Sequence, residues 1–283
     1  MFFSQTQLGH LIKIPYSFHG YRIIQLLNSG SFSVVAKVED ISTHLQFAAK
    51  FISKSDIATM GKAEVIFNEI HILRTTKHPN IIKMYDVLDI KNDYDEEYFV
   101  IIMEYCSNGD LFDYVTQIGF KNEMEKKKIF YNFLKAIEYL HSKGISHGDI
   151  KPENILLDEN LNPKVCDFGF SKSCTVLKDK KRNFSTYFAA PEMFKRGEIN
   201  LLKTDIWAIG VTLYCLSELT FPFLINNEDI IPNEIISGLL QVSTDDEFQV
   251  IFKKCTEMRP ECRPTIKEIL NNDYFSFFNY HSN

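Results

Sequence analysis

The sequence predicts an α+β fold in which an antiparallel sheet with one main helix precedes a mainly helical region. Three observations predict it. Segments rich in β-branched and aromatic residues, separated by turn signals, fill residues 21 to about 105. A single helical pattern interrupts them over residues 62–75. After the turn signal Ser107-Asn108-Gly109, the spacing of apolar residues changes to that of helices.

The first half of the chain is expected to contain five strands and one helix. In the predicted helix, Ile66, Ile70 and Leu73 lie at offsets of 0, 4 and 7 residues, which is one apolar stripe. The acidic segment Ile90–Glu97 is expected to be a solvated loop between the last two strands. The predicted strands are Tyr21–Leu27, Val34–Glu39, Gln46–Ile52, Ile82–Leu88 and Tyr98–Glu104.

The second half is expected to be mainly helical. Its longest helix should end near Lys143-Gly144, because a glycine after a basic residue is a helix-stop signal. A short strand, Pro163–Cys166, is also expected. The predicted helices are Asp110–Thr116, Glu123–Ser142, Lys203–Leu219 and segments near 234–240, 245–256 and 264–271.

The bulk composition excludes several classes of protein. With 283 residues, of which 45% are hydrophobic and 24% charged, the chain can bury a sizeable core, which excludes a disordered or fibrous protein. The formal net charge is -6, and the basic residues are scattered apart from the runs Lys126–Lys128 and Lys178–Arg182. Nucleic acid is therefore not an expected partner.

The chain carries no pattern for export or membrane insertion. Its N-terminal segment lacks a basic region followed by an apolar stretch, and runs such as Trp207–Leu216 fall short of the ~20 residues of a spanning helix. The six cysteines form no CxxC pair and no zinc-like spacing with histidine, which indicates reduced thiols. We expect a protein of the cytoplasm, with the nucleus as the alternative, and no membrane partner.

A small-residue turn follows the first strand in the segment Leu27–Val35. Its backbone N–H groups could cover phosphates, but taken alone such a match is weak evidence, and a plain hairpin turn is the favoured explanation of it. Asn28 stands where a glycine-rich phosphate loop has its first glycine, and it tolerates a positive φ better than most residues. Ser33, at the third glycine position, tolerates it less well.

A lysine and a glutamate of the first half are expected to pair. Strand alternation places Ala48 and Lys50 on the same face of a strand, with Lys50 among apolar neighbours. Glu69 lies at the edge of the helix's apolar stripe, where a carboxylate also needs a partner. The two satisfy each other if the helix packs on that sheet. The alternative is that both are solvated.

The segment His147–Asn154 lies in a loop after the long helix. Within it, Asp149 can accept the proton of an attacking hydroxyl, and Lys151 can neutralise a transferring phosphoryl group. Asn154 can ligate a metal through its amide oxygen, and Asp167 can hold Mg²⁺ that bridges phosphates. Each is by itself an ordinary loop residue, so their joint order is what predicts the chemistry.

Six motifs occur in one order along the chain and closely resemble those of eukaryotic protein kinases. They are Asn28-x-Gly30-x-x-Ser33-x-Val35, Ala48-Ala49-Lys50, Glu69, His147-Gly148-Asp149-x-Lys151-x-x-Asn154, Asp167-Phe168-Gly169 and Ala190-Pro191-Glu192. The resemblance covers roughly residues 21–275 and implies a protein-kinase-like two-lobed fold. The N-lobe would span about 21–104 and the C-lobe about 107–275, with residues 1–20 and 276–283 as short flanking segments.

The resemblance implies which residues carry the reaction and bind ATP and Mg²⁺, with Mn²⁺ as an alternative ion. The implied metal ligands are Asn154 and Asp167. The implied catalytic residues are Asp149, Lys151, Asn154, Lys50 and Glu69. The implied nucleotide-binding residues are Leu27, Asn28, Gly30, Ser31, Phe32, Ser33, Val35, Ala48, Lys50, Glu104, Cys106, Asp110, Leu156 and Asp167.

The same mapping assigns structural roles and a type. Asp205 would brace the catalytic loop, and Arg263 would pair with Glu192. Lys151 and Ser185 resemble the serine/threonine branch. Within that branch the segment that begins at Glu104 looks most like the calcium/calmodulin-dependent and AMP-activated group, which implies a monomeric signalling enzyme acting on Ser or Thr of protein substrates.

Substrate choice is also implied by the resemblance. Asp110 and Glu153 occupy positions that in basophilic relatives contact an Arg upstream of the target residue. Cys215 replaces a third acidic residue that some of these relatives use. A basic residue three positions before the acceptor is therefore expected.

The sequence departs from the family pattern beside the catalytic aspartate. Most members carry an Arg there that binds a phosphorylated activation-loop residue, whereas this chain has Gly148. The usual acceptor Thr falls near Lys181, inside the basic run. We hypothesise that activity does not need phosphorylation of this loop. The alternative is a pseudokinase that serves as a binding or scaffold module, since Gly148, Ser33 and Phe184 all depart from the pattern. A kinase-fold enzyme for small molecules is a third alternative.

Overall fold

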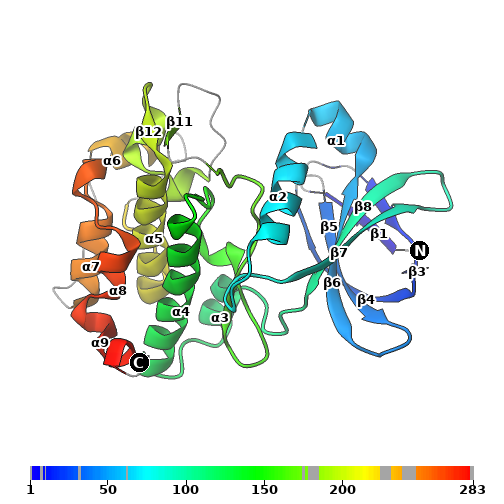
Figure 1. The fold of residues 1–283 in the computed structure, drawn as a ribbon, viewed down its shortest axis with the longest axis horizontal. Coiled ribbons are helices and arrows are strands. Elements are labelled where there is room, and N and C mark those ends of the chain that lie inside the picture. Colours follow the sequence, from blue (N-terminus) through cyan, green and yellow to red (C-terminus); the bar gives the residue numbers. More distant parts are fainter. Residues whose placement is uncertain are drawn as a thin grey trace. The chain divides into compact units, whose positions relative to one another are not determined.

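The strands of the first half form one antiparallel sheet that carries the residues predicted to bind nucleotide. In the computed structural model the six strands lie in the order β3-β4-β5-β6-β8-β7, and every neighbouring pair is antiparallel. Figure 1 shows these strands together with the two helices that follow β6. Their bounds are β3 (Ser17–Phe18), β4 (Tyr21–Ser29), β5 (Ser33–Asp40), β6 (Gln46–Ser53), β7 (Met84–Lys91), β8 (Glu97–Glu104), α1 (Lys54–Met60) and α2 (Ala63–Thr75).

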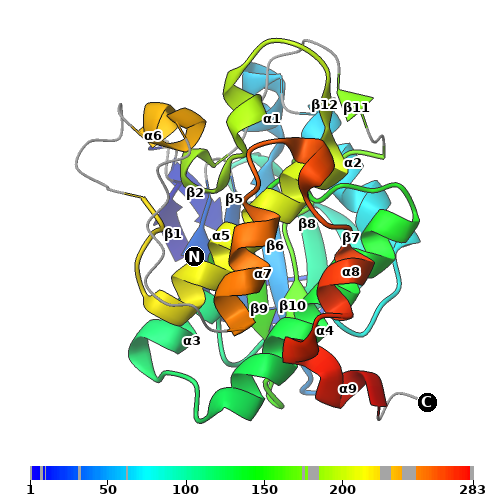
Figure 2. The same ribbon diagram turned by 90° about the vertical axis from the view of Figure 1, so that its left-hand side faces the viewer.

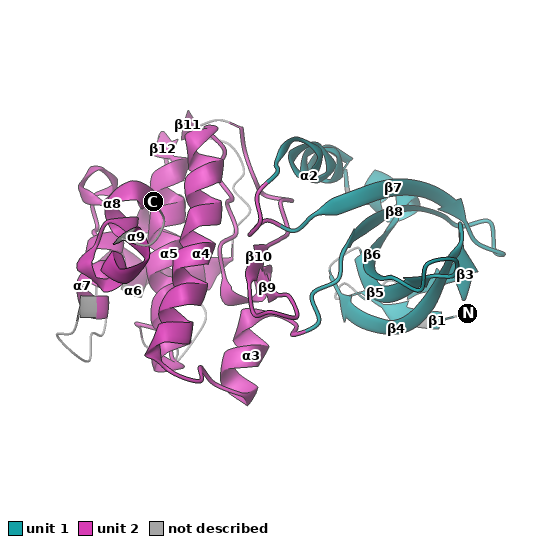
Figure 3. Ribbon diagram, turned by 60° about the horizontal axis from the view of Figure 1, so that its bottom comes forward, with its two compact units in different colours: residues 1–77, 82–107 teal, residues 78–81, 108–283 magenta. Residues whose placement is uncertain are grey.

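The structure describes residues 2–6, 9, 11–30, 33–61, 63–173, 176–177, 185–223, 231–237 and 247–280. Contacts divide the chain into two compact units, coloured separately in Figure 3. Unit 1 comprises residues 1–77 and 82–107, and unit 2 comprises residues 78–81 and 108–283. Each unit is described below by itself.

Helix α2 covers one face of the sheet of unit 1, as its apolar stripe predicts. Ile66 and Ile70 of α2 are buried against Ile52 of β6 and Ile101 of β8. Leu73, the third residue of the stripe, is also buried. Helix α1 was not predicted, although Ser53 caps its first turn by accepting a hydrogen bond from the Asp56 N–H at 3.2 Å.

The other face of the sheet is covered by the N-terminal segment, which the sequence analysis treats as a short flank. Strands β1 (Phe2–Gln5) and β2 (Leu11–Ile14) pair as an antiparallel hairpin. Ile12 and Ile14 of this hairpin are buried in one cluster with residues of β5, β6 and β8, among them Val34 and Phe51. The hairpin therefore completes a core that residues 21–104 alone leave uncovered.

The expected loop Ile90–Glu97 is shorter in the structure, and most of its residues are exposed as predicted, whereas Ile90 and Asn92 are buried. Strand β7 continues to Lys91 and β8 begins at Glu97, so the turn between them contains residues 92–96. Buried Asn92 organises this turn, because its side-chain oxygen accepts from the N–H groups of Tyr94 at 2.9 Å and Glu96 at 3.0 Å. Its amide nitrogen donates to the Lys13 carbonyl of β2 at 3.0 Å, which ties the turn to the hairpin.

Unit 2 is mainly helical. Helix α7 packs along α5, and α8 packs along α4, as the two views in Figures 1 and 2 show. The bounds are α3 (Leu111–Gln117), α4 (Glu123–Ser142), α5 (Leu201–Glu218), α6 (Ile231–Ser237), α7 (Glu247–Cys255), α8 (Ile266–Leu270) and α9 (Ser276–Tyr280). Its short strands are β9 (Ile155–Leu157), β10 (Pro163–Val165), β11 (Val176–Leu177) and β12 (Ile199–Asn200), of which β9 pairs with β10 and β11 with β12.

The predicted α+β class is confirmed, and α4 has the predicted bounds. The predicted helices near 110–116, 203–219, 234–240, 245–256 and 264–271 correspond to α3, α5, α6, α7 and α8. Residues 238–246 lie outside the described part, so the ends of two of these predictions cannot be compared with the structure. Among the described residues, no helix has the length and apolar character that a bilayer crossing requires.

No disulfide joins the cysteines of the described part, which are Cys106, Cys166, Cys215, Cys255 and Cys262. Cys106 and Cys255 are buried, and burial raises the pKa of the Cys255 thiol to about 12. Cys166 and Cys215 are partly exposed, and Cys262 is exposed.

Candidate active site

In unit 1, the predicted pair between Lys50 and Glu69 is confirmed. Strand β6 presents Lys50, and α2 presents Glu69. The ammonium nitrogen of Lys50 lies 2.7 Å and 2.9 Å from the two carboxylate oxygens of Glu69. The side chains are 14% and 3% exposed, respectively, so both charges are largely removed from water and each supplies the counter-charge the other needs.

The predicted phosphate loop is a hairpin between β4 and β5 whose described part needs no unusual backbone conformation. The N–H of Gly30 donates to the Ser33 carbonyl at 2.8 Å, and a strand irregularity lies between Leu26 and Asn28. Asn28 and Ser33 are absent from the described non-glycine residues with positive φ. Neither position therefore relies on the tolerance of positive φ by which the two residue types differ. Ser31 and Phe32 lie outside the described residues.

The other predicted nucleotide-binding residues of unit 1 lie on strands β4, β5, β6 and β8 or, in the case of Cys106, just after β8. Val35 pairs with Lys50, and Ala48 pairs with Met103. Leu27 is 40% exposed, whereas Ala48 and Cys106 are buried. At the end of β8, the N–H of Glu104 donates to the Lys83 carbonyl at 2.8 Å.

In unit 2, the carboxylate of Asp205 anchors the backbone of the loop His147–Asn154, which is called the catalytic loop below. Asp205 lies on α5 and is 2% exposed. Its two oxygens accept hydrogen bonds from the N–H groups of His147 at 2.8 Å and Gly148 at 2.9 Å. The His141 ring nitrogen Nε2 lies 2.9 Å from the same carboxylate. These contacts fix the backbone that leads directly into Asp149.

Asp149 is the centre of a cluster of polar side chains. Its Oδ1 accepts from the hydroxyl of Ser185 at 2.6 Å. Its Oδ2 lies 2.8 Å from the Lys151 ammonium and accepts from the Asn154 amide at 3.0 Å. Lys151 also donates to the Ser185 oxygen at 3.1 Å. The structure thus brings together the three residues of the loop that were predicted to act, and it adds Ser185.

The charge of Lys151 is stabilised by its neighbours. Burial by itself lowers the pKa of the Lys151 ammonium, but the adjacent Asp149 carboxylate raises it, with further contributions from Glu153 and Asp167. The net result is a pKa above the usual range for lysine. Lys151 is therefore a fixed positive charge beside Asp149, which suits the neutralisation of a transferring anionic group.

Asn154 and Asp167 are suited to hold a magnesium ion. The Asn154 amide nitrogen donates to the Asp149 carbonyl at 2.8 Å as well as to its carboxylate, so the amide oxygen points the other way. The Cys166 N–H donates to the Asn154 carbonyl at 3.0 Å, which places Asn154 beside the residue that precedes Asp167. One carboxylate and one amide oxygen, completed by phosphate and water, are ligands that Mg²⁺ prefers.

No group of three or more His, Cys, Asp or Glu side chains in the described ranges could hold a metal ion. A zinc-type centre built from such groups is therefore not found there. The Asp–Asn pair instead matches a metal that shares its coordination with a substrate phosphate.

Two further predicted residues meet beside this loop. Asp110 forms an isolated antiparallel bridge with Leu156, and the N–H of Leu157 donates to the Gly109 carbonyl at 2.8 Å. Asp110 also caps α3 by accepting from the Asp113 N–H at 2.9 Å. Burial raises the pKa of the Asp110 carboxyl above its usual range.

Ser171 and His141 hold the site through contacts that are distant in the chain, and neither residue was predicted. Ser171 is fully buried, and its hydroxyl donates to the His147 carbonyl at 2.9 Å. His141 lies in the last turn of α4, where nothing local distinguishes it from a solvated histidine. The predicted pair of Arg263 with Glu192 is confirmed. The Nη1 and Nη2 groups of Arg263 donate to the two carboxylate oxygens of Glu192 at 2.6 Å and 2.7 Å, respectively. The basic run Lys178–Arg182, including Lys181, and Phe184 lie outside the described residues.

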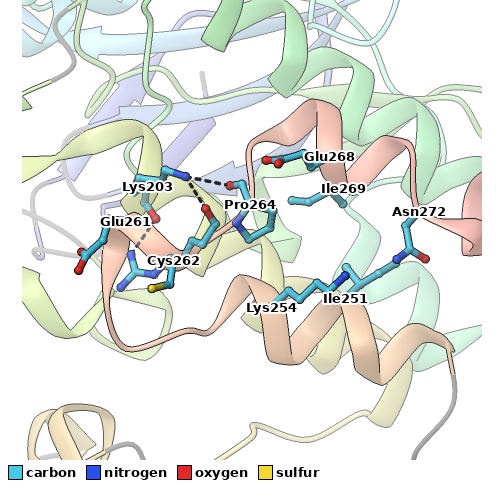
Figure 4. Close-up of a pocket in the computed structure, with 10 residues that line it drawn as sticks. Lys203, Ile251, Lys254, Glu261, Cys262, Pro264, Glu268, Ile269 and Asn272 are labelled. Carbon is cyan, nitrogen blue, oxygen red and sulfur yellow. Dashed lines mark hydrogen bonds between the residues drawn. The ribbon is translucent and has the colours of Figure 1, made fainter.

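A cavity of about 430 Å³ opens in unit 2 between α7, α8 and the loop that joins them. Figure 4 shows Lys203 at this cavity, donating to the carbonyls of Arg263 and Pro264. Glu268 is likewise occupied, since its carboxylate accepts from the Thr265 N–H at 2.7 Å in a capping box. None of the predicted site residues lines the cavity. These polar groups therefore serve the local fold.

The comparisons with known proteins agree with the motifs. The family profile described as "Protein kinase domain" matches residues 21–275. The chain is 32% identical over 284 residues to the serine/threonine-protein kinase SIK2 of Gallus gallus, which covers 93% of this chain and 34% of the relative. It is 32% identical over 256 residues to the serine/threonine-protein kinase SIK1 of Rattus norvegicus, which covers 88% and 32%. The chain thus spans about one third of the length of these relatives.

Replacing Glu69 by Gln should destabilise the protein by about 3 kcal/mol, at the lower end of the range for breaking a buried ion pair. The amide keeps the shape but leaves the Lys50 ammonium without this counter-charge. Urea unfolding measures the effect. The matched control is Asp95→Asn, the same chemical change in the pair of Lys91 with Asp95, whose side chains are 55% and 88% exposed. It should produce no measurable change, and equal losses in both variants would contradict the argument from burial.

Proposed function

Because the chain belongs to the protein kinase domain family, we propose that it transfers the γ-phosphoryl group of Mg-ATP to serine and threonine hydroxyls of proteins. The observation that carries this proposal is the cluster around Asp149, in which a carboxylate, an ammonium and an amide meet with a hydroxyl. The hydrogen bond from the Ser185 hydroxyl to Asp149 supports a role of this carboxylate in accepting a proton from an alcohol. Two relatives named as serine/threonine-protein kinases support the acceptor type.

The chain's own residues divide the work of the reaction. Asp149 orients the attacking hydroxyl and accepts its proton, while Lys151 neutralises charge on the transferring group. Lys50, held by Glu69, binds phosphate oxygens of the nucleotide. Asn154 and Asp167 hold Mg²⁺, which supplies neutralisation of the phosphate charge when it is bound.

We further propose that turnover does not require phosphorylation of the activation loop. Most relatives bind such a phosphate with the side chain at the position of Gly148. Gly148 has no side chain, and its N–H donates to Asp205. The network of Asp149, Lys151 and Ser185 joins the end of the activation segment to the catalytic loop without a phosphate. The protein is proposed to act as a monomer in the cytoplasm, with the nucleus as the alternative.

Substrates with a basic residue three positions before the acceptor are proposed as the preferred class. Asp110 and Glu153 are both in unit 2. The negative charge of Glu153 adds to the effect of burial in raising the pKa of Cys215, and to the effect of Asp149 in raising the pKa of Lys151. Two carboxylates beside the catalytic loop favour a cationic peptide segment.

Asp149→Asn should lower phosphoryl transfer by roughly 10²- to 10⁴-fold while nucleotide binding persists, because only proton acceptance and orientation are lost. Labelled ATP with a protein substrate measures transfer, and Asp93→Asn, in an exposed turn, is the matched control. Absence of transfer by the unaltered protein would favour the pseudokinase. Equal labelling by Asp149→Asn and unaltered protein would identify a contaminating enzyme.

Phosphatase treatment of the active protein should leave its turnover unchanged, since no phosphate is needed to hold the loop. Mass spectrometry confirms that the loop carries no phosphate after treatment, and the same assay measures turnover. A loss of turnover that is regained when one mapped activation-loop phosphate is restored would refute this part of the proposal.

Changing Asp110 to Asn and Glu153 to Gln together should lower kcat/KM roughly tenfold for a peptide with Arg three positions before the acceptor. The ratio of kcat/KM for this peptide to that for a peptide with a neutral residue at the same position is the readout, because an effect of Asp110 on nucleotide binding would lower both values alike. Asn retains the cap of α3, so the fold is kept. A peptide-array profile of the unaltered protein without any basic preference would dispose of the proposal.

A further inference from the structure

The catalytic loop and the segment that carries Asp167 run against each other as a backbone seam, formed by residues 146–148 and 166–172. The N–H of Ser146 donates to the Lys172 carbonyl at 3.0 Å, and the N–H of Lys172 donates to the Ser146 carbonyl at 3.1 Å. At the other end of the segment, the His147 ring nitrogen Nε2 lies 3.0 Å from the Cys166 carbonyl. The segment is therefore held on both sides of Asp167.

The middle of the seam is packed more closely than any side chain would allow. Gly148 has a φ of +81°, and a β carbon built on it would lie 2.6 Å from the carbonyl oxygen of Phe170 and 3.2 Å from its carbonyl carbon. The obstacle is backbone, so it cannot turn aside as a flexible side chain would. On its other side, Gly148 is fixed by the bond from its N–H to Asp205. A β carbon must therefore displace either Phe170 or the catalytic loop.

The contacts around Gly148 tie this close approach to Asp167. The ring of Phe168 lies 5.2 Å from the ring of His147 between centroids. Ser171, next to Phe170, bonds the His147 carbonyl. Asp167 itself has a positive φ of 61°, a conformation that its neighbours must maintain. Because Phe170 follows Asp167 by only three residues, a displacement of the Phe170 backbone would also displace Asp167.

We propose that Gly148 is a positioning residue, whose close contact with Phe170 holds Asp167 in place for binding of Mg-nucleotide without a phosphate on the activation loop. This rests on the proposed kinase function. Most relatives carry an arginine at this position. Here the glycine allows a close backbone contact with Phe170, and this contact, in place of the arginine, holds residues 166–172. Inserting an arginine at this position would break the seam instead of restoring control by phosphate.

The test compares two glycines with similar backbone conformations. Gly144 has a φ of +69°, and a β carbon on it would meet nothing within 4 Å. Gly144→Ala and Gly148→Ala therefore share the strain of a positive φ, but only Gly148→Ala meets Phe170. Binding of a fluorescent ATP analogue is measured with Mg²⁺ and with EDTA. We expect Gly148→Ala to weaken binding about tenfold with Mg²⁺ and to leave binding in EDTA unchanged, whereas Gly144→Ala should bind like the unaltered protein.

Two additional measurements keep the result decisive. Amide hydrogen exchange at Lys172 should be about tenfold faster in Gly148→Ala and unchanged in Gly144→Ala, and this readout needs no nucleotide. Ser171→Ala, which removes one seam bond without adding a β carbon, should show the same Mg²⁺-specific weakening at about threefold, even if Gly148→Ala fails to fold.

Three outcomes would overturn the proposal: unchanged exchange at Lys172 in Gly148→Ala, equal weakening with Mg²⁺ and with EDTA, or equal effects at Gly144 and Gly148. Failure of the proposed function looks different. In that case the unaltered protein transfers no phosphoryl group, while exchange at Lys172 still reports whether the seam depends on Gly148.

Discussion

The arrangement of unit 2 depends on one buried carboxylate. Asp205 lies within the most buried helix of this unit, and a charge placed there must be compensated by donors at close range. Two consecutive backbone N–H groups of the catalytic loop and a histidine ring meet this requirement. Because the donors are backbone groups, the loop has little freedom in how it passes the carboxylate. The direction of Asp149, the next residue, follows from this constraint.

Much of the fold could be predicted where the information was local. The apolar spacing and end signals of α4 placed both of its ends correctly, and strand alternation combined with one helical stripe was enough to pair Lys50 with Glu69. Helix α1, strand β9 and the N-terminal hairpin were not predicted. These elements are short, and their stability comes from burial against distant residues. Asn92 illustrates the same limit, since an asparagine among acidic residues suggests solvent until its partner Lys13 is seen across the fold.

The residues of the candidate site likewise fall into those that the local sequence predicts and those whose role depends on contacts distant in the chain. Asp149, Lys151 and Asn154 could be predicted because their order in one loop has chemical meaning, whereas Ser171 owes its role to a carbonyl 24 positions away. Gly148 is the most instructive residue. From the sequence it could be interpreted only as an arginine that is missing. In the structure, the backbone of Phe170 lies where a β carbon at this position would have to be. The absence of a side chain is therefore what the packing here needs.

The N-terminal hairpin has a practical consequence for work with this protein. The family profile begins at residue 21, yet Ile12, Ile14 and Phe18 cover apolar side chains of the central strands. A version trimmed to the family boundaries would present that apolar face to solvent, and such faces drive self-association. Preparations intended for crystallisation or inhibitor screening should therefore retain residues 2–18, because the limits of family similarity and the limits of the cooperative folding unit differ in this chain.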